Sequence, residues 1–253
     1  MATVDLNCDL GEGYGDWRMG DDAAMLRIVT SVNVACGFHA GDPQIMAGTF
    51  AAAKQRGVAV GAHPGYPDIQ GFGRRHIPYS PAEIERIIAY QLGAAIAVAR
   101  LAGHRITHVK AHGALGNLAA DDRSIADAVV RATKAVDLGL TILAIAGTEI
   151  ERAADGAGMR AAREIFADRA YTPTGRLVPR KEPGAVIHDP GAAATRVVRM
   201  LEAGAVIAVD GTRVPVGIDS ICVHGDTPGA VALASAVRAA VTKAGFDLRP
   251  FAS

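Results

Sequence analysis

Five residues that can exchange protons or bind a metal lie where a predicted strand ends and a loop begins. They are Asp9, His39, His63, His112 and His224. Any one of them alone could be structural, but the five follow five different strands. Because reactive residues of α/β barrels and open α/β sheets gather at the carboxyl ends of the strands, this set predicts an active site there.

The alternation of side chains along three strands predicts a polar barrel interior. Successive strand residues face opposite sides, and the side opposite the apolar residues carries polar groups. These groups are Asp5, Asn7 and Asp9 in the first strand, His108, Lys110 and His112 in the fourth, and Cys222 and His224 in the seventh. Burying them is unfavourable unless they pair or bind a ligand. We expect a functional site, with a structural hydrogen-bond network as the alternative, and a structural partner such as a buried cation for Asp5.

Several familiar motifs are missing from the sequence. It has no GxxxxGK[ST] phosphate loop, no GxSxG elbow, and no Rossmann pattern in the glycine-rich stretch 11–15. His104 and His108 have a zinc-like spacing, but His104 is expected at the end of the barrel opposite the active site. Cys36 and Cys222 lie near strand ends, where buried free cysteine is more common than a nucleophile.

Arginines in and near glycine-rich loops are candidate anion ligands. The stretches 61–65 and 71–75 are rich in glycine, and the second contains two arginines. Arginine binds carboxylate or phosphate through paired hydrogen bonds, although exposed arginines are commonly just solvated. The candidates are Arg74, Arg75, Arg176 and Arg180.

The elements that must position these residues alternate between strand and helix, which is typical of a parallel sheet with helical crossovers. Strands are expected at 3–9, 31–37, 58–63, 106–112, 140–145, 160–166 and 219–224, and helices at 20–29, 43–56, 81–102, 121–136, 148–155, 190–203 and 228–244. Seven strand–helix units favour a distorted barrel, with a doubly wound open sheet as the alternative. Asp210–Gly211 predicts a two-residue hairpin turn between 206–209 and 212–216.

Four helix starts share one form, in which a capping side chain precedes a proline at the first helical position. The pairs are Asp42–Pro43, Ser80–Pro81, Asp189–Pro190 and Thr227–Pro228. Ser80 and Glu83 are also expected to form a capping box.

Composition excludes several classes of protein. The 253 residues have a formal net charge of zero, which argues against a nucleic-acid binder or a basic membrane-surface protein. No apolar run approaches the roughly 20 residues that cross a bilayer. Three cysteines without CxxC spacing indicate a reducing compartment. We expect a cytoplasmic protein with a single α/β domain spanning 1–253.

Six segments together resemble a known family. They are 5–13, 33–43, 61–74, 109–115, 164–169 and 222–226, which extend over nearly the whole chain. The sequence is similar to the LamB/YcsF family. Ala111 and Gly116 depart from the family pattern, which has proline and tyrosine there, and this puts the substrate range or local loop shape in question.

The resemblance implies a distorted (β/α)7 TIM-like barrel of the glycoside hydrolase and deacetylase kind. It also implies a hydrolase that cleaves the cyclic amide 5-oxo-L-proline to L-glutamate, with ATP as co-substrate together with Mg²⁺. B and C partner subunits are expected, and a homo-oligomer is compatible with the sequence.

Within that reading, the residues divide into two sets. We expect a catalytic set of Asp9, His39, His63, Lys110, His112 and His224, and a substrate-binding set of Asn7, Glu12, Asn33, Arg74 and Asp226. Asp9 or one of the histidines at the strand ends would orient or deprotonate water. Lys110 and Arg74 would stabilise the negative charge that develops during the reaction.

Two alternatives stay open. Asp9, His39 and His63 could bind one divalent metal in a metal-dependent amidase or deacetylase. The chain could also be a non-catalytic substrate-binding subunit whose chemistry lies in its partners.

Overall fold

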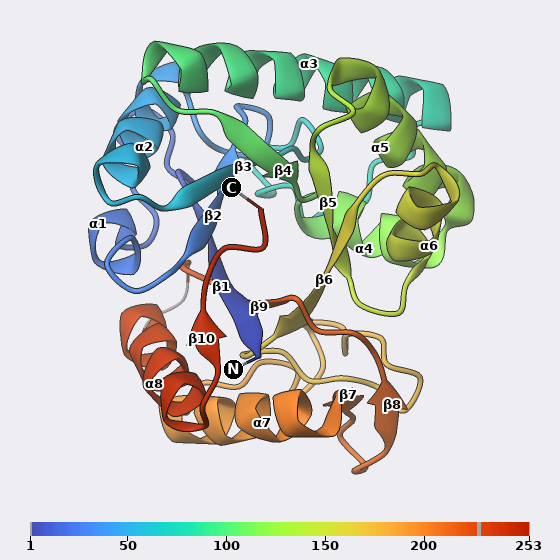
Figure 1. Ribbon diagram of the computed structural model, residues 1–253. Helices are drawn as coiled ribbons and strands as arrows, with labels where there is room; N and C mark the ends of the chain where they lie inside the picture. Colours follow the sequence, from blue (N-terminus) through green and yellow to red (C-terminus); the bar gives the residue numbers. More distant parts are fainter. Residues whose placement is uncertain (1, 227–228, 253) are drawn as a thin grey trace.

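The computed structural model describes residues 2–226 and 229–252 and contains a closed barrel of parallel strands surrounded by helices (Figure 1). Within the described residues the barrel strands are β1 (Thr3–Leu10), β2 (Ser31–Ala35), β3 (Ala59–His63), β4 (Ile106–Val109), β5 (Thr141–Ile145), β6 (Ala161–Phe166) and β9 (Ser220–Val223). Strand β9 pairs in parallel with both β6 and β1, which closes the barrel. The predicted seven-stranded barrel is therefore confirmed, and the alternative of an open sheet is wrong.

The helices that cover the barrel begin largely where their caps predict. Asp42, Ser80 and Asp189 each accept a hydrogen bond from the first turn of the following helix, and Ser80 and Glu83 form the expected capping box. Thr227 and Pro228 lie outside the described residues. The helices are α1 (Asp22–Met25), α2 (Pro43–Gln55), α3 (Pro81–Leu101), α4 (Gly113–Asp121), α5 (Arg123–Val136), α6 (Glu149–Gly156), α7 (Pro190–Ala203) and α8 (Ala230–Lys243).

Several local features differ from the prediction. The predicted helix 20–29 is only the four residues of α1, and the predicted strand 106–112 ends at Val109. Helix α4 was not expected, and it begins directly after His112. Strand β10 (Asp247–Leu248) was not expected either, and it pairs with the start of β1. The hairpin of β7 (Ala205–Ile207) and β8 (Arg213–Pro215) exists, but its strands are separated by residues 208–212. The two-residue turn is wrong because the Asp210 carboxylate accepts a hydrogen bond from the Thr212 N–H and holds a longer loop.

Polar side chains fill the barrel interior, as the alternation of residues predicts. The Asn7 amide donates to Glu164 and to Ser220, each at 2.8 Å. The Asn33 amide donates to Asn7 and to Asp9, also at 2.8 Å. Buried polar groups are tolerated when they are hydrogen-bonded in this way. This part of the interior is therefore a structural network that supports the groups above it.

The structural partners of Asp5 among the described residues are hydroxyl groups. Its carboxylate accepts hydrogen bonds from Thr30, Ser31 and Ser220. Burial raises the pKa of Asp5 to about 6, although these hydrogen bonds oppose the rise. Asp5 therefore stabilises the end of the barrel where the strands begin, away from the predicted active site at their carboxyl ends.

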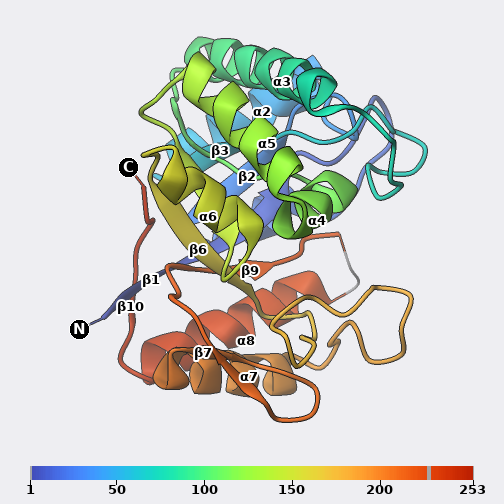
Figure 2. The same cartoon turned by 90° about the vertical axis from the view of Figure 1, so that its right-hand side faces the viewer.

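The two ends of the barrel have different coverings. Figure 2 shows the segments that follow β3 and β6 extending to one side, while both chain ends lie on the other. At the N-terminal end of the strands, the Phe251 ring lies 4.9 Å from the ring of His108. A cavity lies at the opposite end of the barrel, beyond the carboxyl ends of the strands. No helix among residues 2–226 and 229–252 is long and apolar enough to span a membrane.

Candidate active site

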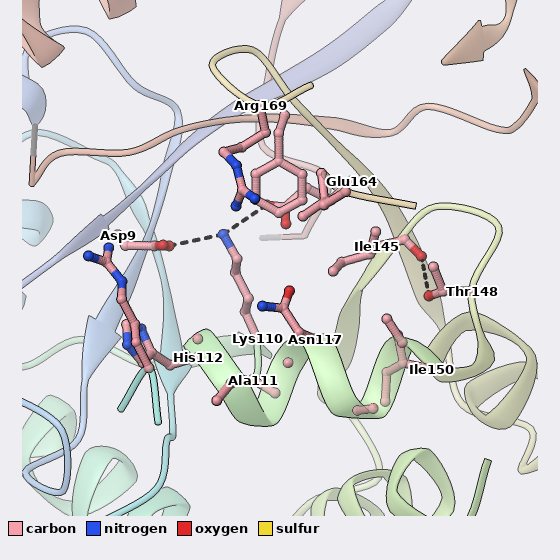
Figure 3. Close-up of a pocket in the computed structure, with 18 of the residues that line it drawn as sticks. Asp9, Lys110, Ala111, His112, Asn117, Ile145, Thr148, Ile150, Glu164 and Arg169 are labelled. Carbon is pink, nitrogen blue, oxygen red and sulfur yellow. Dashed lines mark hydrogen bonds and ion pairs between the residues drawn. The ribbon is translucent and has the colours of Figure 1, made fainter. Parts of the chain in front are cut away.

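A cavity of about 530 Å³ lies at the carboxyl ends of the strands, where the sequence placed the reactive groups. Acidic, basic and imidazole side chains from β1, β3, β4, β6 and β9 line one part of it. Helix α4, the segment 176–181 and apolar residues of β5 and α6 line other parts of it. Figure 3 shows Lys110 reaching between Asp9 and Glu164, with Arg169 beside Glu164 and with Asn117 projecting from α4.

Lys110 is the central charge of the cavity. Its Nζ lies 3.0 Å from Asp9 Oδ1, 3.0 Å from Glu164 Oε1 and 3.2 Å from Cys222 Sγ. Burial alone would lower the pKa of Lys110, but Asp9, Cys222 and Glu164 hold it well above its usual value. Lys110 is therefore a fixed cation.

The two carboxylates beside Lys110, Asp9 and Glu164, differ in the direction in which their pKa values are shifted. Burial would raise the pKa of Asp9, but interactions with His63 and Lys110 outweigh it and hold the pKa well below the ordinary value. For Glu164, burial raises the pKa even though Lys110 opposes the rise. Asp9 is thus the more firmly ionised of the two.

His224 is oriented by a carboxylate that was not among the predicted site residues. Its Nδ1 lies 2.7 and 2.9 Å from the two oxygens of Asp168. Burial would raise the pKa of Asp168, but His224 outweighs it and the pKa is lowered. An ionised carboxylate only accepts, so Nδ1 carries the proton and Nε2 is left to accept one. Ligand atoms of His224, Asp9 and Cys222 lie within 4.8 Å of one another.

The geometry of His224 fits a general base. A base whose second nitrogen is fixed by a carboxylate has the tautomer and orientation needed to take a proton from water. The Phe166 ring stacks on the imidazole at 5.6 Å and limits its movement.

His63 and His112 form a second imidazole group. His63 Nδ1 donates to the Lys110 carbonyl at 2.8 Å, and His112 Nε2 donates to the Phe72 carbonyl at 2.7 Å. The remaining nitrogens, His63 Nε2 and His112 Nδ1, face each other at 3.0 Å. Two lone pairs repel at that distance, so a proton or a metal ion must lie between them. Asp9 Oδ2 is 3.4 Å from His63 Nε2 and favours positive charge there.

His39 lies behind this pair and not in the cavity. Its ring stacks on His112 with centroids 3.6 Å apart and an interplanar angle of 4°. Burial, then His112 and His63, lower the pKa of His39 well below its usual value, so the ring is neutral. Neither ring nitrogen of His39 has a hydrogen-bond partner among the described residues.

Possible metal ligands fall into two groups among the described residues. Glu12, His39, His63 and His112 form one, and Asp9, Cys222 and His224 form the other. The expected set of Asp9, His39 and His63 is divided between them. Burial, then Asp9 and Asp226, raise the pKa of Glu12 well above its usual value. Glu12 therefore takes up a proton more readily than an exposed glutamate does.

The remaining predicted residues separate into two layers. Glu12, Arg74 and Asp226 line the cavity, and Arg74 forms an ion pair with Asp226 at 2.5 Å. Asn7 and Asn33 are buried below the cavity in the interior network. They are placed to orient Asp9 and Glu164.

Residues that were not among the predicted site residues supply much of the site. Glu164, Phe166, Asp168 and Arg169 lie at the end of β6 and just beyond it. Strand alternation places Glu164 and Phe166 on one side of β6 and Arg163 on the other, so a charged residue beside an aromatic one on the same side was the available signal. Nothing comparable pointed to Asp168 as the partner of His224.

Comparisons with known proteins show the family of this chain. The LamB/YcsF family model matches residues 4–253. A protein from Rhodopseudomonas palustris (strain BisB18), named as the A subunit of 5-oxoprolinase, is 55% identical over 253 residues, which are 100% of this chain and 99% of that one. The structure of the lactam utilization protein from Thermus thermophilus is 45% identical with a TM-score of 0.93, covering 98% of this chain and 100% of that one.

A more distant structure shares the fold alone. The GH26 β-mannanase of Bacteroides ovatus is 9% identical with a TM-score of 0.50, and the match covers 97% of this chain and 90% of that one. The expected likeness to glycoside hydrolase barrels is therefore confirmed for the fold.

Proposed function

This chain belongs to the LamB/YcsF family, and we propose that it is the A subunit of an ATP-dependent 5-oxoprolinase, a hydrolase that acts on a cyclic amide. One observation carries the proposal. In a chain 55% identical to a protein named as that subunit, one cavity contains a carboxylate-oriented imidazole, His224, and a fixed cation, Lys110. Ring opening by water needs a base and a stabiliser of negative charge.

The chemistry explains why ATP is consumed. A five-membered lactam is a stable amide and a poor electrophile. Transfer of the γ-phosphoryl group of ATP to the carbonyl oxygen gives ADP and an imidoyl phosphate. Water then adds to the ring carbon, the C–N bond breaks as nitrogen takes a proton, and an acyl phosphate forms. A second water converts it to glutamate and phosphate.

Named residues have roles in the water-dependent steps. His224 Nε2 takes the proton of the attacking water, and Asp168 keeps the opposite nitrogen protonated. Asp9 orients that water from the other side. Lys110 and Arg74 stabilise the negative charge that develops on oxygen. General base help of this kind contributes roughly 10²–10⁴-fold.

Partner subunits complete the scheme. The sequence has no P-loop motif, so we assign ATP, with Mg²⁺, to a site formed with B and C subunits. An ATP-dependent reaction and three free cysteines suit the reducing cytoplasm.

The test is glutamate formation from 5-oxo-L-proline, measured together with ADP release. The chain is assayed alone and with B and C subunits from the same source. We expect activity only in the complete mixture, and loss of activity in His224→Gln. If His224→Gln retains full activity in the complete mixture, the cavity does not catalyse the reaction. The chain then serves only to bind substrate.

A metal-dependent amidase is the second candidate, and the facing nitrogens of His63 and His112 are the observation that favours it. Imidazole and carboxylate side chains suit zinc and similar divalent ions, and His39 and Glu12 complete the donor set. Metal analysis of the purified chain, followed by chelation, separates the candidates. One divalent ion per chain, with ATP-independent amidase activity lost on chelation, would replace the first proposal.

A further inference from the structure

Positive charge gathers on one segment of the cavity lining. The segment that links β6 to α7 contributes Arg169, Arg176, Arg180 and Lys181 to the lining. Arg176 forms an ion pair with Asp121 at 2.7 Å, so its charge is already balanced. Among the described residues, neither Arg169 nor Arg180 forms an ion pair with a carboxylate.

Arg169 is a buried cation held by backbone carbonyls. It is only 4% exposed. Its Nη2 donates to the Val178 carbonyl at 2.6 Å, and its Nε donates to the Ala185 carbonyl at 3.4 Å. These contacts fix the direction of the guanidinium without neutralising its charge. Among the described residues, no carboxylate lies within ion-pair distance of Arg169.

Like charges surround this buried arginine. Burial, then Arg180, lower the pKa of Arg169 to about 10, and Arg74 acts in the same direction. Asp168 and Tyr171 act in the opposite direction, and the Asp168 carboxylate is also paired with His224. Arg180 forms no hydrogen bond or ion pair within the described residues. A group of arginines that repel one another in a cavity is stabilised when an anion binds between them.

We propose that Arg169 and Arg180 form a subsite for a phosphoryl group, which in the proposed reaction is the phosphoryl group of the activated lactam. The inference rests on the proposed function for the identity of that ligand. It assigns this chain the later half of the reaction. The phosphorylated lactam is bound and hydrolysed here, wherever ATP itself is bound.

Charge and size favour a phosphoryl group over the carboxylate of the lactam. Two arginines that form no ion pair among the described residues match the two negative charges of a phosphoryl group better than the single charge of a carboxylate. A cavity of about 530 Å³ suits ligands larger than a five-membered ring. The additional space therefore accommodates a second group on the same ligand.

The proposed subsite lies near His224, the proposed general base. Arg180 acts on both Arg169 and Asp168 through its charge, and Asp168 orients His224. A phosphoryl group held at Arg169 and Arg180 would place the attached ring carbon toward Asp9 and His224. Water bound between those two residues would then be close to the carbon that it must attack.

The test measures binding of inorganic phosphate to the full chain by titration calorimetry, at constant ionic strength maintained with chloride. We expect Arg180→Gln to weaken phosphate binding at least tenfold, because Arg180 supplies charge without holding other groups in place. Arg199→Gln is the matched control, since Arg199 is exposed on α7 and does not line the cavity. Arg169→Gln should act in the same direction, but its burial makes Arg180→Gln the deciding variant.

Binding of 5-oxoproline and of acetate to the same variants separates a phosphoryl subsite from a carboxylate subsite. Support requires that Arg180→Gln loses phosphate and keeps 5-oxoproline. If the wild-type chain does not bind phosphate, or if Arg180→Gln binds it as well as wild type, the inference is wrong. Loss of 5-oxoproline and acetate with phosphate unaffected also overturns it. If the chain binds phosphate through Arg180 but has no 5-oxoprolinase activity, the phosphoryl subsite is supported and only the proposed reaction is wrong.

Discussion

The facing nitrogens of His63 and His112 lie 3.0 Å apart while each ring donates its other N–H to a backbone carbonyl. If both rings were neutral and kept these donors, two lone pairs would oppose each other, which is unfavourable. The Asp9 carboxylate, 3.4 Å from His63 Nε2, compensates a positive charge at this position. The state of this pair therefore distinguishes the two candidate functions. A shared proton between the rings is compatible with the 5-oxoprolinase subunit, and a bound metal ion indicates the metal-dependent amidase.

Nitrogen NMR of the histidine rings distinguishes the two states. If the pair shares a proton, His63 and His112 together carry three N–H groups in metal-free protein, with one of them between the rings. Addition of Zn²⁺ should leave the spectrum unchanged if the pair shares a proton. Two N–H groups, together with one tightly bound metal ion per chain, would instead identify a metal site.

The Asp168–His224 pair predicts a specific loss in Asp168→Asn. The asparagine amide would donate to His224 Nδ1 and shift the proton to Nε2, so the imidazole could no longer accept a proton from water. We expect glutamate formation in the complete subunit mixture to fall by about 10²-fold or more, with unchanged circular dichroism. Asp189→Asn is the matched control, because Asp189 caps α7 and asparagine caps helices equally well. Equal rates for Asp168→Asn and the control would exclude an orienting role.

Lys110→Met tests the central cation through stability. Methionine keeps much of the volume but leaves Asp9 and Glu164 buried without their shared partner. Removing one member of a buried ion pair costs about 3–5 kcal/mol, so we expect a loss of that size in denaturant unfolding at pH 8. The loss should be smaller at pH 5, because carboxylates without a counter-charge become protonated.

The control for Lys110→Met is Lys243→Met, which removes an exposed lysine from the last turn of α8. Its unfolding free energy should change by less than about 0.5 kcal/mol. If the two variants are equally stable at pH 8, the carboxylates beside Lys110 are already neutral in the folded protein.

Alternation along single strands made much of the barrel interior predictable. The polar side of β1 and the residues of β4 that face it follow from a period of two, which does not depend on neighbouring strands. The helix caps fixed most boundaries within about two residues, because a capping side chain followed by proline allows little choice of register. Asp9, Lys110 and His224 were therefore identified correctly as groups at one end of the barrel.

Partnerships across the closed barrel were not predictable. Lys110 meets Glu164 only because β4 and β6 face the same interior, and His224 meets Asp168 only because β9 closes the barrel beside β6. Helix α4 was missed because Gly113 and Gly116 are poor helix formers. The role of Gly61 was equally hidden, since a Cβ at that position would overlap the His108 ring.

The raised pKa of Asp5 predicts a change of stability with pH. The folded pKa is about 6 and the ordinary value is 3.8, so between these values the folded state binds more protons than the unfolded state. The contribution of Asp5 to stability is then complete below about pH 3.8 and lost as pH rises through about 6. Linkage gives a loss of about 3 kcal/mol. Asp5→Asn has no proton to lose, so the free energy of unfolding of wild type should fall relative to Asp5→Asn between pH 4 and pH 7.

Denaturant unfolding of both proteins across that range measures the difference directly. Asp155→Asn, at an exposed position on α6, should give no such change relative to wild type. A constant difference between wild type and Asp5→Asn would mean that Asp5 is ionised throughout. The hydroxyls of Thr30, Ser31 and Ser220 would then be sufficient to stabilise a buried carboxylate, and burial would not control its protonation.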